Sequence, residues 1–125
     1  MVMKLRFQVA DVRKPLISVH RISELLNFTR FGPGEKDNYI ENAKTGDKML
    51  LHKKGVGSYV LKVRFVGGSE TEIVVDSGAE ENVCPLWWGK KFGLSDPARW
   101  LNLVDASGNR IKHHGSRVVE VVSPF

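Results

Sequence analysis

Hydrophobic and polar residues alternate with a period of two along much of the chain, and this period predicts β-strands. In residues 3–9 every second side chain is apolar, beginning with Met3. The clearest alternation runs over residues 59–65, and Gly67-Gly68 then separates it from an apolar run that ends at Asp76. We therefore predict a half-buried strand over residues 59–65 and a buried strand that ends at Asp76, joined by a tight glycine turn.

Shorter segments continue the same pattern. Strands are predicted over residues 28–31, 39–40, 49–51, 100–104, 109–113 and 117–122. The Thr45-Gly46-Asp47 turn between the second and third of these predicts a hairpin. Turn signals recur about every ten residues, which favours an all-β fold, closed or sandwiched, over alternating strands and helices.

Helical spacing is confined to two short stretches. Ile22, Leu25 and Leu26 follow a helical period, and Ser18 is predicted to cap the helix that contains them. Residues 85–92 are predicted to form a short helix or a turn. The predicted fold class is therefore all-β with one or two short helices.

Composition points to one ordinary globular domain, residues 1–125. The chain has 125 residues, of which 42% are hydrophobic, enough for one core. No apolar run approaches the length of a membrane span and no N-terminal signal pattern occurs, so we expect no membrane association. The single Cys84 excludes an intramolecular disulfide and fits a reducing intracellular location, most simply the cytoplasm.

Charge and metal-ligating residues give little sign of other functions. The net charge of +5 is spread along the chain rather than gathered in a block, so nucleic-acid binding is not favoured. The four His and one Cys lack the spacing of a zinc site, and we predict no metal or cofactor. His113 and His114 are adjacent positions of a predicted strand and should face opposite sides.

The segment with the clearest chemical meaning is Ile73-Val74-Val75-Asp76-Ser77-Gly78-Ala79. A buried apolar strand here delivers a carboxylate to a place where Gly78 leaves room for another backbone. A peptidase that uses an acid to activate water needs this arrangement. The Asp-Ser-Gly tripeptide also occurs in ordinary turns, so the flanking residues decide between the two interpretations.

These flanks resemble the retroviral-like aspartic proteases, the retropepsins. Residues 59–68 resemble the first long strand and glycine turn of that family, and Glu72-Ile73-Val74-Val75 resembles the strand that carries the catalytic Asp. Glu80-Glu81-Asn82-Val83-Cys84 is similar to the acidic and apolar residues that follow the motif. Residues 104–111 resemble the flap hairpin, and residues 114–119 resemble the strand after it.

The order of these parts differs from the family order. Retropepsins continue after the flap with a strand, an apolar pair with Gly and a short helix, and these parts resemble the start of this chain. Phe7–Val12 resembles the strand, Pro15–Val19 resembles the apolar pair with Ser18 in place of Gly, and His20–Asn27 takes the helix position. The resemblance implies a closed, β-barrel-like retropepsin fold in circularly permuted order, with residues 53–57 joining the usual chain ends.

This permuted order makes predictions about neighbouring segments. Residues 2–9 should pair with residues 116–122, because those strands flank the turn that the permutation opens. Residues 48–52 should lie beside residues 58–65. Residues 1–31 should pack against the strand that ends at Asp76 rather than form a separate unit.

The resemblance also implies a mechanism and a set of site residues. One Asp-Ser-Gly per chain is half of an aspartic peptidase site, so a homodimer would supply two Asp76 carboxylates that act on a polypeptide, such as a polyprotein. In this scheme Asp76 is catalytic, Ser77, Gly78 and Ala79 form the active-site loop, and the implied substrate contacts are Glu80, Val83, Ala106, Ser107, Gly108, Leu16 and Ile17. We further predict that Glu80 pairs with Arg21.

Two other functions remain open. The domain could have lost activity and serve as a dimerisation or peptide-binding module, although a pure scaffold has no need of a buried acid such as Asp76. It could also be a small basic β-barrel that binds nucleic acid, but the chain lacks exposed aromatic residues interleaved with Lys or Arg.

Overall fold

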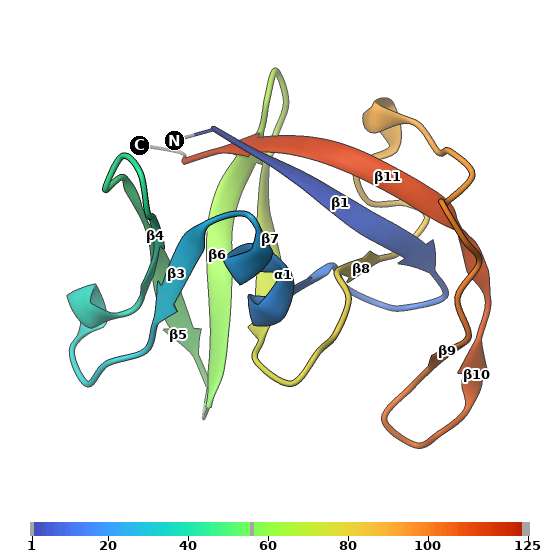
Figure 1. Ribbon diagram of the computed structural model, residues 1–125, viewed down its shortest axis with the longest axis horizontal. Coiled ribbons are helices and arrows are strands. Elements are labelled where there is room, and N and C mark those ends of the chain that lie inside the picture. The colour runs from blue at the N-terminus through green and yellow to red at the C-terminus, as the bar shows by residue number, and fades with distance from the viewer. Residues whose placement is uncertain (1, 56, 124–125) are drawn as a thin grey trace.

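The computed structural model describes residues 2–55 and 57–123, and most of its regular structure is β-strand (Figure 1). The strands are β1 Val2–Ala10, β2 Leu16–Ser18, β3 Asn27–Arg30, β4 Tyr39–Asn42, β5 Lys48–Lys54, β6 Ser58–Phe65, β7 Glu70–Asp76, β8 Val83–Cys84, β9 Leu103–Val104, β10 Arg110–Ile111 and β11 His113–Val122. One helix, α1 Val19–Glu24, and two 3₁₀ turns, Glu35–Asp37 and Lys90–Phe92, complete the described elements. The all-β prediction with one or two short helices is confirmed at this level.

Nearly all strands belong to one large sheet. Among the described residues its order is β11-β1-β8-β2-β7-β6-β5-β4-β3, and a further pairing joins β11 to β6. The short strands β9 and β10 form a separate hairpin that projects from the lower right of Figure 1. Within the described residues, no helix is long and apolar enough to cross a membrane.

The core follows the predicted alternation. Along β1 the alternate residues from Met3 to Val9 are buried, whereas Lys4 and Arg6 are exposed. Phe7 is fully buried, and its ring meets Trp88 at a centroid distance of 4.9 Å. Burial of such large apolar side chains is the main favourable term that holds the sheet together.

The helix α1 is shorter than predicted. Its predicted cap is confirmed, because the Ser18 side chain accepts a hydrogen bond from the Arg21 backbone N–H at 3.3 Å. The helix ends at Glu24, however, and Leu25 and Leu26 lie outside it and are exposed. Leu26 adopts φ 60°, a left-handed conformation that a helix cannot continue through.

The strands near the C-terminus also differ from the prediction. Of residues 100–104 and 109–113, only β9, β10 and His113 are strand, and in the described chain β9 and β10 pair only with each other. By contrast, β11 already begins at His113, since its partner β1 extends the pairing to Ala10. Residues 85–92 form turns that end in the 3₁₀ turn Lys90–Phe92.

The neighbouring segments that the permuted order predicts are found together. Strand β1 pairs antiparallel with β11 from Val2↔Val122 onward, and β5 pairs antiparallel with β6. Strand β2 pairs in parallel with β7, so Ser18 lies opposite Asp76. The N-terminal third of the chain is therefore built into the sheet that carries Asp76. Met1, Val56, Pro124 and Phe125, which flank the two predicted junctions, lie outside the described residues.

Restoring the usual retropepsin order should preserve the fold. We expect a chain whose two ends are joined by a short Gly/Ser linker, and which is opened at Gly55, to fold with a free energy of unfolding changed by about 1 kcal/mol, the scale of a loop-closure difference. Gly55 suits the opening because it is exposed and has no atom near its Cβ direction. Urea unfolding of both chains measures the difference, and a rearranged chain that fails to fold would contradict the expected neighbourhood of the ends.

Candidate functional site

Asp76 is placed by the centre of the large sheet. It is the last residue of β7, which pairs with β6 on one side and with β2 on the other. Ile73 and Val75 point into the core and are buried, whereas Asp76 is half-buried at the strand end. Two flanking strands thus fix the backbone from which the carboxylate projects.

The loop after β7 presents the predicted motif at the surface. The Gly78 backbone N–H donates to Asp76 Oδ1 at 2.8 Å, which orients the carboxylate. Ser77 and Gly78 are exposed, and Ala79 is half-buried. The arrangement offers a fixed carboxylate beside backbone that another chain can approach.

A hydrogen-bond network that sequence reasoning missed holds this loop in place. Ser18 Oγ donates to the Ala79 carbonyl oxygen at 2.6 Å, and the Ser18 N–H donates to Asn82 Oδ1 at 2.7 Å. Asn82 Nδ2 donates to the Arg6 carbonyl oxygen at 3.0 Å. Both side chains are buried, so the network ties β1, β2 and the loop together away from water. The one sign of this role in the sequence is the position of Asn82, an amide side chain between two acidic residues and an apolar pair.

The predicted ion pair between Glu80 and Arg21 is wrong, because Arg21 pairs with the Glu81 carboxylate instead. Arg21 Nε donates to the backbone carbonyl oxygen of Glu80 at 3.1 Å, and its Nη2 pairs with the Glu81 carboxylate. The hydrogen bonds that Arg21 donates to Glu81 and, second, to Glu24 raise the pKa of Arg21. The Glu80 side chain is exposed instead. Arg21 still fixes the loop, through Glu81 and the Glu80 backbone.

The predicted apolar contacts divide into two kinds. Leu16 and Val83 are half-buried and lie opposite each other in the β2–β8 pairing beside the loop. Ile17 is fully buried in the core, so its side chain cannot touch a substrate and the predicted substrate contact is wrong. The residue instead supports the site from the core. The reason is alternation: along β2 only every second side chain can face outward.

The predicted flap tip is an exposed turn between β9 and β10. Asp105 Oδ1 accepts from the N–H groups of Ser107, at 2.9 Å, and Asn109, at 2.8 Å. These backbone hydrogen bonds, led by that of Asn109, lower the pKa of Asp105. Ala106, Ser107 and Gly108 are exposed, and Gly108 has φ 83°. The hairpin and the Asp76 loop both lie toward the lower edge of Figure 1, and coverage of Asp76 by the hairpin stays a prediction.

The cysteine and the two adjacent histidines, His113 and His114, have structural contacts or burial that explain them without a catalytic role. Cys84 is buried, and burial raises the pKa of its thiol to about 11, which makes it a poor nucleophile at neutral pH. His114 contacts Asp11 Oδ1 at 2.6 Å, whereas His113 contacts Gln8, so the two histidines do have different partners. In the described part of the chain no cluster of three or more His, Cys, Asp or Glu could hold a metal ion.

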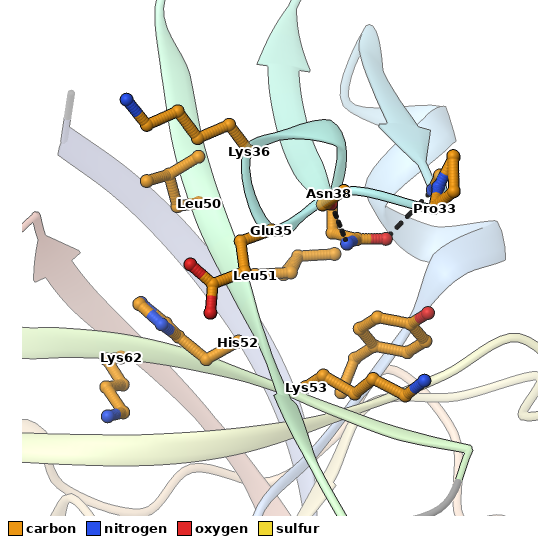
Figure 2. A pocket seen from close by; sticks show the side chains of 12 residues that line it. Pro33, Glu35, Lys36, Asn38, Leu50, Leu51, His52, Lys53 and Lys62 are labelled. Carbon is orange, nitrogen blue, oxygen red and sulfur yellow. Dashed lines mark hydrogen bonds between the residues drawn. The ribbon is translucent and has the colours of Figure 1, made fainter.

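A groove of about 470 Å³ lies apart from these residues, between the Gly32–Asn38 loop and strands β5 and β6 (Figure 2). Asn38 braces the loop, since its side chain accepts from the Gly32 N–H and donates to the Gly34 carbonyl oxygen. The Glu35 carboxylate points toward His52, while the ammonium groups of Lys36, Lys53 and Lys62 point in different directions. The polar groups do not converge on one point, and none of the predicted site residues lines the groove.

Asp76, its loop and the Ser18–Asn82 network are thus the best-organised candidate site among the described residues. Comparisons with protein families, with curated proteins and with solved structures gave no match.

Proposed function

We propose that this chain is an aspartic endopeptidase of retroviral or retrotransposon type that works as a homodimer. The observation that carries the proposal is the placement of Asp76. The residue ends a central strand between β6 and β2, it is half-buried, and it heads an Asp-Ser-Gly-Ala loop held from behind by Ser18 and Arg21.

In this mechanism two Asp76 carboxylates, one from each protomer, share one proton and bind one water. Like charges in contact do not both ionise cheaply, so one carboxyl stays protonated while the other removes a proton from the water. The protonated one hydrogen-bonds the scissile carbonyl as the water attacks it. Ser77 would link the two loops across the two-fold axis.

The peptide substrate would lie extended between the active-site loop and the β9–β10 hairpin. Backbone groups around Gly78 and Ala79 would hold it from one side, with Glu80, Leu16 and Val83 beside them. Ala106, Ser107 and Gly108 would close over it and exclude water. The exposure of both loops in the single chain supports this arrangement, because a substrate and a partner must reach them.

The residues directly after α1 in the chain form a surface that could bind the second copy of the dimer. Leu25, Leu26 and Phe28 are 50%, 57% and 62% exposed, and β3 is the last strand in the order of the described sheet. An edge strand with exposed apolar side chains is a ready site for pairing with another chain. We propose a second copy as the occupant because the site needs a second carboxylate and because α1 is tied to the Asp76 loop through Arg21.

The finer fold assignment and the location belong to the same proposal. The pairing of β11 with β6 connects β11, β1, β8, β2, β7 and β6 in a ring of neighbours, which supports a closed, barrel-like retropepsin fold in permuted order. The buried free thiol of Cys84 supports a reducing, intracellular location.

Incubation with a mixed peptide library tests the function. We expect cleavage that is fastest at acidic pH, because one member of the dyad must stay protonated, and that a statine-type inhibitor blocks. Inhibitor-sensitive binding without cleavage would favour the inactive peptide-binding module instead. A rate that rises steadily up to about pH 9 would contradict the shared-proton mechanism.

A further inference from the structure

The base of the β9–β10 hairpin is fastened by one histidine ring. His113 Nδ1 accepts a hydrogen bond from the Leu101 backbone N–H at 3.0 Å. Leu101 lies two residues before β9, and His113 lies two residues after β10, so this bond closes the hairpin at its base. Within the described residues β9 and β10 pair only with each other, which leaves the hairpin few other attachments.

The partners of the ring fix its protonation state. Nε2 lies 2.8 Å from Gln8 Oε1 and 2.9 Å from the Gly115 carbonyl oxygen, which is an acceptor, so Nε2 carries a hydrogen. Nδ1 faces an N–H donor and must therefore be unprotonated. The observed geometry thus fits the neutral imidazole alone, because in the imidazolium both nitrogens are donors.

We infer that His113 is a pH-sensitive latch for this hairpin. A proton on Nδ1 places two N–H groups against each other and breaks the bond to Leu101. Acidification drives proton uptake by an imidazole, and acidic conditions are those that a carboxyl dyad requires. The inference rests on the proposed function in one respect: the hairpin is the one proposed to close over the peptide.

Among the described residues, no carboxylate makes a hydrogen bond or ion pair with the ring that would hold the imidazolium in the same place. The groups in contact with it are Gln8 from β1, the Gly115 carbonyl from β11, and the Leu101 N–H with the Trp100 ring from the segment before β9. The other charged residues of these elements and their flanks are of three kinds. Lys4, Arg6, Asp11, Asp96, Arg99, Arg110 and Lys112 are exposed, Glu120 is half-buried, and the buried Arg117 donates to the backbone carbonyl oxygens of Leu86, Trp88 and Gly93. Asp11 is engaged by His114 rather than by His113.

Amide hydrogen exchange between pH 5 and pH 8 tests the latch. We expect the protection of the Leu101 amide, corrected for intrinsic exchange, to fall about fivefold to tenfold as the His113 ring becomes protonated, the change expected for loss of one hydrogen bond. His113→Asn offers an amide oxygen in place of Nδ1 and should make this protection independent of pH. His114→Asn is the matched control and should leave the pH dependence in place.

Constant Leu101 protection across the titration of the His113 ring in the unaltered protein would overturn the inference, as would an unchanged pH dependence in His113→Asn. The readout does not require peptidase activity. A chain that cleaves no peptide but opens at Leu101 would therefore refute the proposed function alone. A chain that cleaves peptides without this opening would refute the latch alone.

Discussion

Replacing Asp76 by Asn is expected to abolish peptide cleavage and to leave the fold intact. An amide cannot take a proton from water or share one with a second carboxyl, so the water is no longer activated. General acid–base catalysis contributes about 10²- to 10⁴-fold, and with both members of the dyad changed in a homodimer the loss should reach at least the upper value. Initial rates on a cleaved library peptide, at the pH of maximal activity, measure the loss.

The fold should tolerate this change because the main structural contact of Asp76 survives it. Asn Oδ1 can still accept the Gly78 N–H bond that Asp76 Oδ1 accepts at 2.8 Å. Asp47→Asn is the matched control: Asp47 is exposed at the turn between β4 and β5, and its substitution should leave the rate unchanged. A well-folded Asp76→Asn protein that cleaves at a comparable rate would show that another group activates the water.

The sequence predicts strands better than it predicts where they stop. Alternation located β1 and β6 to within one residue at each end, because each has a buried and an exposed face. The apolar run before Asp76 located the end of β7 but not its start at Glu70. The helix end was misplaced, since Leu25 and Leu26 match a helical period but are exposed side chains outside α1. Their apolar character fits contact with another chain better than a core role, and sequence periodicity does not distinguish the two.

For the candidate site, the sequence predicts the residue that would react but not the residues that hold it. Asp76 stands out because an apolar strand leads into it. Ser18 and Asn82 support its loop across 64 residues of sequence, and no local pattern encodes a contact between segments so far apart. The same reason explains the error over Glu80: a carboxylate near an arginine is predictable, but which of two adjacent acids faces it depends on the turn.

Dilution should reduce activity per chain, because each chain holds one Asp76 and the mechanism needs two. Below the dimer dissociation constant, the specific rate should fall in proportion to the dimer fraction measured by sedimentation equilibrium at the same concentrations. Full activity from a species shown to be monomeric would contradict the homodimeric site.

At a fixed protein concentration, Phe28→Arg should also reduce the activity per chain, because it should weaken the dimer. Phe28 is 62% exposed on β3, beside the exposed Leu26, so an arginine there costs the monomer little. In the dimer it would place two like charges near the two-fold axis within an apolar contact. A central apolar contact of this kind is worth about 2 kcal/mol, so the dimer dissociation constant should rise at least 30-fold.

Trp87→Arg is the matched control for Phe28→Arg, because Trp87 is 61% exposed but belongs to the turn between β8 and the Lys90–Phe92 segment rather than to the edge strand β3. This variant should keep the dissociation constant and the rate of the unaltered protein. If Phe28→Arg stays dimeric and active while Trp87→Arg dissociates, the second copy binds through the other surface. If both variants dimerise normally and still require a partner for activity, the two copies meet through the Asp76 loops without help from β3.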